Sequence, residues 1–204
     1  MGSPLSGTRI AVIGHRSADL EGVAAAIPDA FATSIAFDEN LSYEFAEFAA
    51  VVLAISAHEG APNTLIMAWE EIAEFQVPRM ILVTKIDEPE ADFDEAVLIA
   101  RRMFGEGVTP YLVLHDDEGK PCAFIDLENL TIRDYSSGTL VIKPSDEDHR
   151  VLVQEFSEEY LEAIADLDGS RFATGLFVPI IPFSHTLHLG EVELATYLNE
   201  VLER

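Results

Sequence analysis

The sequence predicts an α/β protein: a doubly wound, mostly parallel sheet with helices on both faces, carrying a small inserted α+β subdomain. Three apolar runs of strand length are each followed by an amphipathic helical segment, as in a sheet with right-handed crossovers. A later stretch alternates short strands with glycine turns, which is typical of antiparallel hairpins. With 204 residues, 49% of them hydrophobic, the chain can bury a full core.

The expected strands of the first half are apolar runs bounded by turn residues, as in strands that are buried on both faces of a sheet. They span 9–14, 33–37 and 49–56, and a fourth lies within 77–87. The expected helices have good helix formers and an acidic or proline-containing first turn, and they span 19–27, 62–75 and 91–104, with a single helical turn at 43–48. The inward face of the third helix should consist of Phe93, Val97, Ala100 and Phe104.

The second half begins with short strands, expected at 111–114, 121–127, 130–134 and 139–142. A long acidic helix should follow at 147–165, and its buried face should contain Val151, Leu152, Phe156, Tyr160 and Ile164. A strand at 176–183 and a helix at 190–202 end the sequence. We therefore predict an α/β core at 8–107 and 175–204 and an inserted subdomain at 108–174.

The charge balance argues against one class of function, nonspecific binding to nucleic acid. Lys and Arg number 12 against 37 Asp and Glu, a formal net charge of -25. This does not favour direct nonspecific nucleic-acid binding, although binding through a small basic patch is not excluded.

The single cysteine, Cys122, excludes an internal disulfide and fits a reducing compartment. The longest apolar run has roughly ten residues, whereas a membrane span needs about 20. We expect a cytoplasmic protein without a membrane segment.

Polar side chains follow the fourth expected strand, where ligands of parallel sheets bind. Thr84, Lys85 and Asp87 have the spacing [Asn/Thr]-Lys-x-Asp, the guanine-recognition signature of GTPases. In that signature the aspartate accepts two hydrogen bonds from the guanine edge, and the lysine stem covers the ring. A second interpretation is that these residues are inherited remnants, or that Lys85 and Asp87 form a local ion pair.

Five segments carry a resemblance to a known family, and they occur in the same order as in that family. They are Phe48 to Gly60 with its Ser-Ala-x-x-Gly turn, Val77 to Phe93 around Thr-Lys-Ile-Asp, Ala123 to Leu127, Glu158 to Leu161, and Val178 to Ser184. These segments resemble the G and G′ domains of elongation factor G, a translational GTPase. The resemblance covers most of the chain and implies a P-loop-NTPase-like fold with a G′-like insertion. It also makes Ser184 a candidate for the loop that contacts the base.

The phosphate loop departs from that family. The family pattern Gly-x-x-x-x-Gly-Lys-[Ser/Thr] holds phosphates with backbone amides and the lysine, and Mg²⁺ with the hydroxyl. The corresponding segment runs from Gly14 to Glu21, with Asp19 in place of the second glycine, Leu20 in place of the lysine and Glu21 in place of the magnesium ligand. Each lost or reversed charge contact should cost about a few kcal/mol, so we expect the family's mode of phosphate binding to be lost.

The switch regions should be missing as well. Gly14 and Asp87 are only 73 positions apart, much less than in the family. The remaining candidate for the Asp-x-x-Gly switch motif is the segment 37–41, which has no glycine. No residue is left to position an attacking water, so we expect no catalytic residue and no GTP hydrolysis.

These observations lead to the hypothesis of a degenerate elongation-factor-G-like domain, a pseudo-GTPase that acts as a translation-related binding or regulatory protein. A protein partner, such as the ribosome or another part of the translation machinery, is expected because the acidic helix at 147–165 would attract a cationic surface. No cofactor is expected, and no metal, because His185 and His188 have no third ligand at a suitable spacing.

Two alternatives stay open. One is a guanine-nucleotide-binding protein or GTPase with an altered phosphate site, in which Thr84, Lys85, Asp87 and Ser184 hold the base of GTP or GDP. The other is an unrelated α/β enzyme whose pocket the sequence does not reveal.

Overall fold

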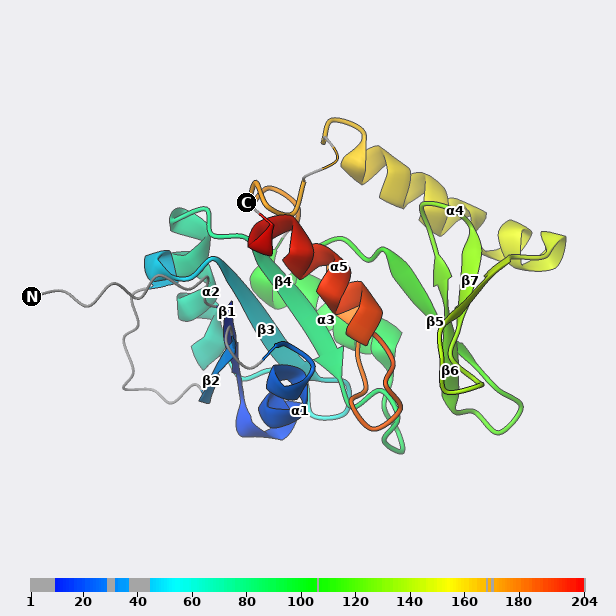
Figure 1. Ribbon diagram of the computed structural model, residues 1–204, viewed down its shortest axis with the longest axis horizontal. Coiled ribbons are helices and arrows are strands. Elements are labelled where there is room, and N and C mark those ends of the chain that lie inside the picture. Colours follow the sequence, from blue (N-terminus) through cyan, green and yellow to red (C-terminus); the bar gives the residue numbers. More distant parts are fainter. Residues whose placement is uncertain are drawn as a thin grey trace, which may run out of the picture.

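The structure is a computed structural model that describes residues 10–28, 32–36, 45–105, 107–167, 169 and 171–203 (Figure 1). These residues form two sheets, five helices and two short 3-10 helices at Arg16–Ala18 and Phe45–Glu47. The predicted fold class is confirmed, because a parallel sheet flanked by helices is joined to a smaller antiparallel sheet. The exact boundaries of the inserted subdomain stay a prediction.

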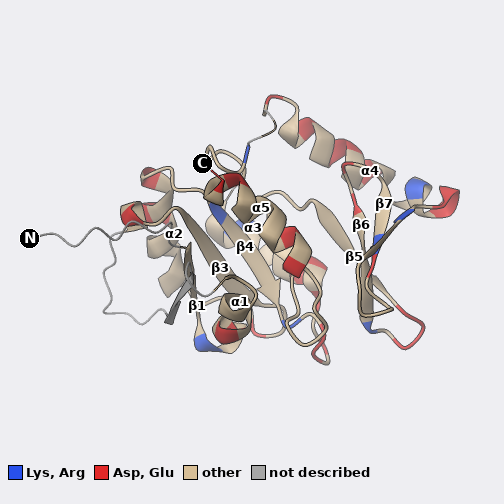
Figure 2. Ribbon diagram, viewed as in Figure 1, with Lys and Arg blue, Asp and Glu red and all other residues tan. Residues whose placement is uncertain are grey.

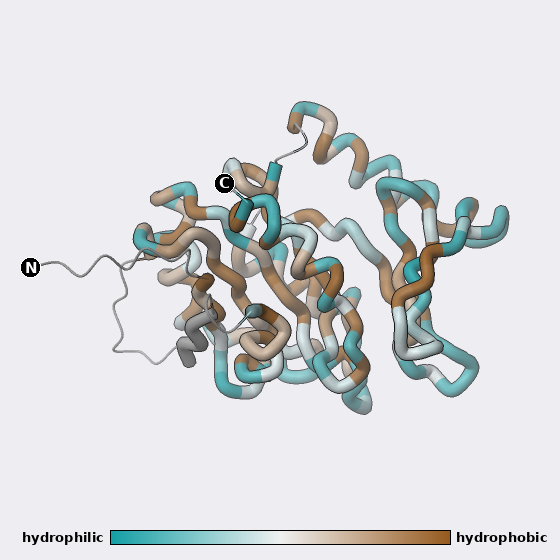
Figure 3. The backbone as a smooth tube through the Cα atoms, in the orientation of Figure 1, coloured by the Kyte–Doolittle hydropathy of each residue, from teal (hydrophilic) through white to brown (hydrophobic). Residues whose placement is uncertain are grey.

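The parallel sheet has the strand order β2-β1-β3-β4-β9. Its strands are β1 (Ile10–Gly14), β2 (Ala32–Ala36), β3 (Ala50–Ser56), β4 (Arg79–Thr84) and β9 (Ile180–Pro182). Every residue of β1 and β3 is buried, which explains why these strands are continuous apolar runs without alternation (Figure 3). The last strand is shorter than the predicted 176–183, and Leu176 is exposed.

Helices cover both faces of this sheet. Figure 1 shows α1 (Leu20–Ala25) and α5 (Glu191–Leu202) on one face and α2 (Thr64–Glu74) and α3 (Phe93–Phe104) on the other. The four residues predicted to face inward from α3 are all buried. The indole N–H of Trp69 donates a hydrogen bond to the Phe104 carbonyl oxygen at 2.9 Å, which fixes α2 against the end of α3.

The antiparallel sheet has the order β5-β6-β7-β8. Its strands are β5 (Tyr111–His115), β6 (Pro121–Asp126), β7 (Thr131–Asp134) and β8 (Val141–Pro144), and the helix α4 (Glu147–Ile164) follows them. The Ser157 hydroxyl of α4 donates to the Leu127 carbonyl oxygen at 2.7 Å, which ties the helix to the loop after β6.

The predicted buried face of α4 is partly wrong. Tyr160 and Ile164 are buried as expected, but Val151, Leu152 and Phe156 are 68%, 73% and 50% exposed. The helix instead buries the face that contains Val153 and Ser157. The apolar pattern alone did not predict this face, because a polar residue, Ser157, occupies one of its buried positions and donates to a main-chain carbonyl oxygen.

No helix in the described part of the chain is both long enough and apolar enough to cross a membrane.

Candidate functional site

The candidate site lies at the carboxyl edge of the parallel sheet, where neighbouring strands end side by side. Ser56 is opposite Thr84, and Val83 is opposite Pro182, so the segments after β3, β4 and β9 meet at one edge. Because β1 lies next to β3 with Gly14 opposite Ala54, the loop that follows Gly14 reaches the same edge. The topology therefore brings the degenerate phosphate loop and the predicted base-binding residues together.

Thr84 is fully buried, and its hydroxyl connects two other segments. Its Oγ1 lies 3.0 Å from the carbonyl oxygen of Ala18 and 3.0 Å from that of Ile55. One contact reaches the loop that follows β1 and the other reaches β3. Thr84 thus holds the loop against the sheet, and its side chain is not presented to solvent.

Lys85 and Asp87 have different partners from those considered in the sequence. Lys85 has a positive φ of 59° and pairs with Glu88 at 2.9 Å, and this hydrogen bond raises the pKa of Lys85. The Lys85–Asp87 ion pair, one of the alternatives considered in the sequence analysis, is therefore not formed. Asp87 is exposed, and its Oδ2 accepts a hydrogen bond from the Thr186 hydroxyl at 2.6 Å.

Ser184 lies in the loop between β9 and α5 and is buried. Its Oγ accepts from the backbone N–H of Leu187 at 3.2 Å and lies 3.0 Å from the Thr186 hydroxyl. Ser184, Thr186 and Asp87 therefore form a short chain of hydrogen-bonding groups. Thr186 was missed in the sequence, because nothing local connects it with an aspartate that precedes it by 99 positions.

The degenerate phosphate loop is closed by its own aspartate. Asp19 has φ 50° and ψ 50°, a left-handed conformation that Asp and Asn tolerate better than most side chains. Its carboxylate accepts from the backbone N–H of Gly22 at 3.2 Å and caps the N-terminus of α1. A carboxylate thus occupies a helix N-terminus of the kind that binds phosphate in P-loop proteins.

Leu20 and Glu21 complete the change of this loop. Leu20 is buried and packs closely over Gly14. The contact leaves no room for a side chain at Gly14, since an added Cβ would lie 2.9 Å from the Leu20 Cδ2. Glu21 is exposed on the first turn of α1. Leu20, which stands where the P-loop pattern has its phosphate-binding lysine, therefore contributes to the core. The segment 37–41, the candidate switch remnant, lies outside the described residues.

Comparisons with known proteins test the resemblance that the sequence suggested. No known family profile matches the chain. Two curated proteins, each named "Elongation factor G-like protein", from the CDC 1551/Oshkosh and H37Rv strains of Mycobacterium tuberculosis, are 27% identical to it over 160 residues. The expected resemblance to elongation factor G is confirmed. The match covers 69% of this chain, and the chain spans 22% of the length of each of these elongation-factor-G-like relatives.

A solved structure supports the same fold. A crystal structure of a protein from Thermus thermophilus superimposes with a TM-score of 0.72 and covers 96% of this chain and 40% of that one. At 19% sequence identity, this likeness shows the fold alone. The architecture of this chain is therefore shared with a known structure well beyond the sheet.

His185 and His188 lie in the same loop as Thr186 and share one carboxylate. Their Nδ1 atoms lie 3.5 Å and 2.9 Å from Oε1 of Glu191. Among the residues that the structure describes, no group of three or more His, Cys, Asp or Glu side chains is arranged to hold a metal ion. The two histidines thus contact the first turn of α5.

A buried charge network joins α5 to the antiparallel sheet and was also missed in the sequence. Glu193 of α5 is 0% exposed, and its carboxylate accepts hydrogen bonds from the Arg133 side chain and, at 2.5 Å, from the Tyr135 hydroxyl. Burial and the adjacent Glu193 charge raise the pKa of Tyr135. A lone Glu in an amphipathic helix gives no sign of this role, because its partners lie some 60 residues earlier.

Proposed function

We propose that the chain is a degenerate elongation-factor-G-like domain that does not hydrolyse GTP and acts as a translation-related binding or regulatory module. One observation carries this proposal: the Asp19 carboxylate caps the Gly22 amide at the start of α1. A phosphate would have to displace this carboxylate or approach it, and like charges at close range repel.

The neighbouring residues support the same conclusion. Buried Leu20 supplies no cation to balance a phosphate, whereas the P-loop lysine does so in active GTPases. Thr84, Asp87 and Ser184 hold their polar atoms in contacts within the protein. A nucleotide would therefore lose phosphate contacts and compete for base contacts at the same time.

A cationic protein surface is the proposed partner, within the translation machinery and in the cytoplasm. Acidic side chains are spread over both parts of the molecule and are frequent along α4 (Figure 2). Exposed carboxylates of this helix include those of Glu147, Asp148, Glu155, Glu158, Glu159 and Glu162. Such a surface would speed association with a basic partner and would repel nucleic-acid phosphates.

The alternative is a guanine-nucleotide-binding protein with an altered phosphate site. It is favoured by the preserved placement of Thr84, Lys85, Asp87 and Ser184 along one sheet edge. In this alternative the guanine edge would replace the Thr186 hydroxyl as the donor to Asp87. The phosphates would lie outside the loop that the Asp19 carboxylate caps.

A titration separates the two proposals. Fluorescent GDP and GTP are added to the purified protein with and without Mg²⁺, and we expect no saturable binding in the micromolar range. Saturable binding that is lost in Asp87→Ala but kept in Asp117→Ala would overturn the first proposal and support the alternative. Asp117 is a matched control because its carboxylate is exposed in the turn between β5 and β6.

A further inference from the structure

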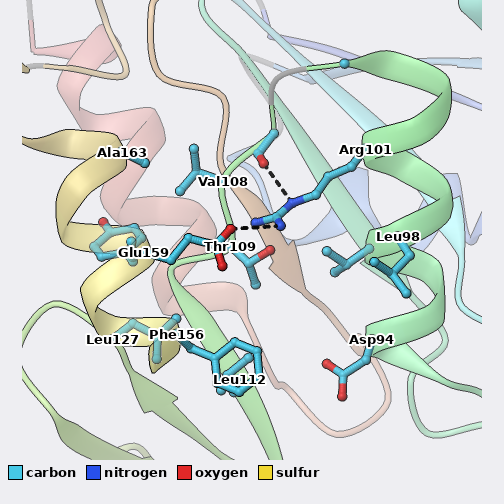
Figure 4. Close-up of a pocket in the computed structure, with 14 residues that line it drawn as sticks. Asp94, Leu98, Arg101, Val108, Thr109, Leu112, Leu127, Phe156, Glu159 and Ala163 are labelled. Carbon is cyan, nitrogen blue, oxygen red and sulfur yellow. Dashed lines mark hydrogen bonds and ion pairs between the residues drawn. The ribbon is translucent and has the colours of Figure 1, made fainter. Parts of the chain in front are cut away.

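A cavity of about 610 Å³ lies between α3, α4 and β5, apart from the candidate nucleotide site (Figure 4). Its walls are mostly apolar, and they include Leu98 of α3, Leu112 of β5 and Phe156 of α4. Leu98 and Phe156 are 67% and 50% exposed, so two large apolar side chains of its wall face solvent. Pockets of this volume with apolar walls and few polar groups are typical of small-molecule sites.

One polar atom in this cavity lacks a partner. Thr109 lines the cavity between the two helices and is only 7% exposed (Figure 4). Its Oγ1 is buried and forms no hydrogen bond with any described residue. A buried hydroxyl without a partner is unfavourable, so this wall of the cavity contains an unsatisfied polar group.

The charged groups around the cavity differ in whether they have an ion-pair partner. Arg101 donates from Nε to the Gly107 carbonyl oxygen at 3.0 Å and pairs with Glu159 of α4 at 3.4 Å, so these two charges offset each other. Asp94 has no ion pair with any described residue, and burial together with neighbouring Asp92 raises its pKa. A carboxylate in this position favours a cationic ligand.

We propose that this cavity binds a small cationic amphiphile, namely an amine with an aromatic or aliphatic body. The body packs on Leu98, Leu112 and Phe156, and the ammonium group lies against Asp94. The net charge of -25 adds a long-range attraction for the same class of ligand. The site does not depend on the proposed loss of nucleotide binding.

Three probes with one fluorophore test this assignment. Dansylcadaverine carries an ammonium group, dansylamide is neutral and dansylglycine carries a carboxylate. We expect saturable binding with a blue shift, tightest for dansylcadaverine and weakest for dansylglycine. Leu98→Ser and Phe156→Ser should each weaken the binding of dansylcadaverine by about tenfold, because each removes apolar contact area. Asp94→Asn should reduce the preference for the amine over the neutral probe, because the short-range partner of the ammonium group is lost while the long-range attraction of the net charge remains.

Matched controls use exposed residues outside the cavity. Met67→Ser removes a large apolar side chain that is 78% exposed on α2, and Asp117→Asn removes a carboxylate; both should leave binding unchanged. Equal effects of Met67→Ser and Phe156→Ser would show nonspecific adsorption and overturn the proposal. A preference for dansylglycine, or no saturable binding of any probe, would overturn it as well. Circular dichroism confirms that each variant is folded.

Discussion

The Thr186 hydroxyl donates a hydrogen bond to Oδ2 of Asp87 across 2.6 Å and so joins two loops that lie 99 positions apart. The same hydroxyl oxygen lies 3.0 Å from Oγ of Ser184. The two loops that carry Asp87 and Ser184 are thus connected to each other directly. Asp87 thus accepts a hydrogen bond that links the loop after β4 to the loop after β9.

The strength of this contact can be measured. We expect Thr186→Val and Asp87→Ala to lower the free energy of unfolding by about 1 kcal/mol each, a typical value for one hydrogen bond. The double variant should lose less than the sum, because both substitutions remove the same contact. Urea unfolding of the four proteins gives the coupling energy, and strict additivity would show that the bond does not contribute in solution.

Asp19 offers a test of the closed loop. Asp19→Ala should cost about 1–2 kcal/mol, because alanine loses the cap of α1 and disfavours the left-handed backbone. Asp19→Asn keeps both properties, and Asp19→Gly keeps the backbone freedom, so both should cost much less. Thermal unfolding of the three variants gives the order. An alanine variant as stable as the asparagine variant would mean that the cap has little energetic effect.

Most elements of the fold could be predicted from local patterns. The buried strands β1, β3 and β4 are apolar runs that end at turn residues, and α3 begins at an aspartate cap and ends at Gly105. These signals lie within a few residues of the element they define. The buried face of α4 could not be obtained in this way, because it includes Ser157, a polar residue whose acceptor lies on another segment.

The candidate site was predicted only in part, for the same reason. The spacing of Thr84, Lys85 and Asp87 identified a polar strand end, and the departure at Asp19 identified a changed phosphate loop. Their actual partners, Ala18, Glu88 and Thr186, depend on how the strand ends meet in space. A single sequence contains no local pattern that would reveal a hydrogen bond between residues 99 positions apart.

Asp134 gives a prediction for acid stability. Hydrogen bonds from Lys143 and Ser136 lower the pKa of Asp134 from 3.8 to about 2. Because the folded value lies below the unfolded one, its contribution to stability is present above about pH 4 and is lost as the pH falls toward 2. The stability difference between the unsubstituted protein and Asp134→Asn should shrink over this window.

The measurement is urea unfolding at several pH values, combined with an NMR titration of the Asp134 carboxyl group. In Lys143→Met the pKa of Asp134 should move back toward 3.8, because the hydrogen bond with the largest effect is removed. An unchanged pKa in that variant would assign the shift to the Ser136 contacts instead.

Glu193 is the residue for which we expect the largest single effect on stability. Glu193→Leu leaves the largely buried Arg133 guanidinium without its carboxylate and the Tyr135 hydroxyl without its acceptor, at a cost of roughly 3–5 kcal/mol. The double variant Arg133→Met with Glu193→Leu should be more stable than Glu193→Leu alone, because no unpaired charge remains buried. Urea unfolding compares the two, and a double variant less stable than Glu193→Leu would show that Arg133 contributes mainly through its packing over the Tyr111 ring.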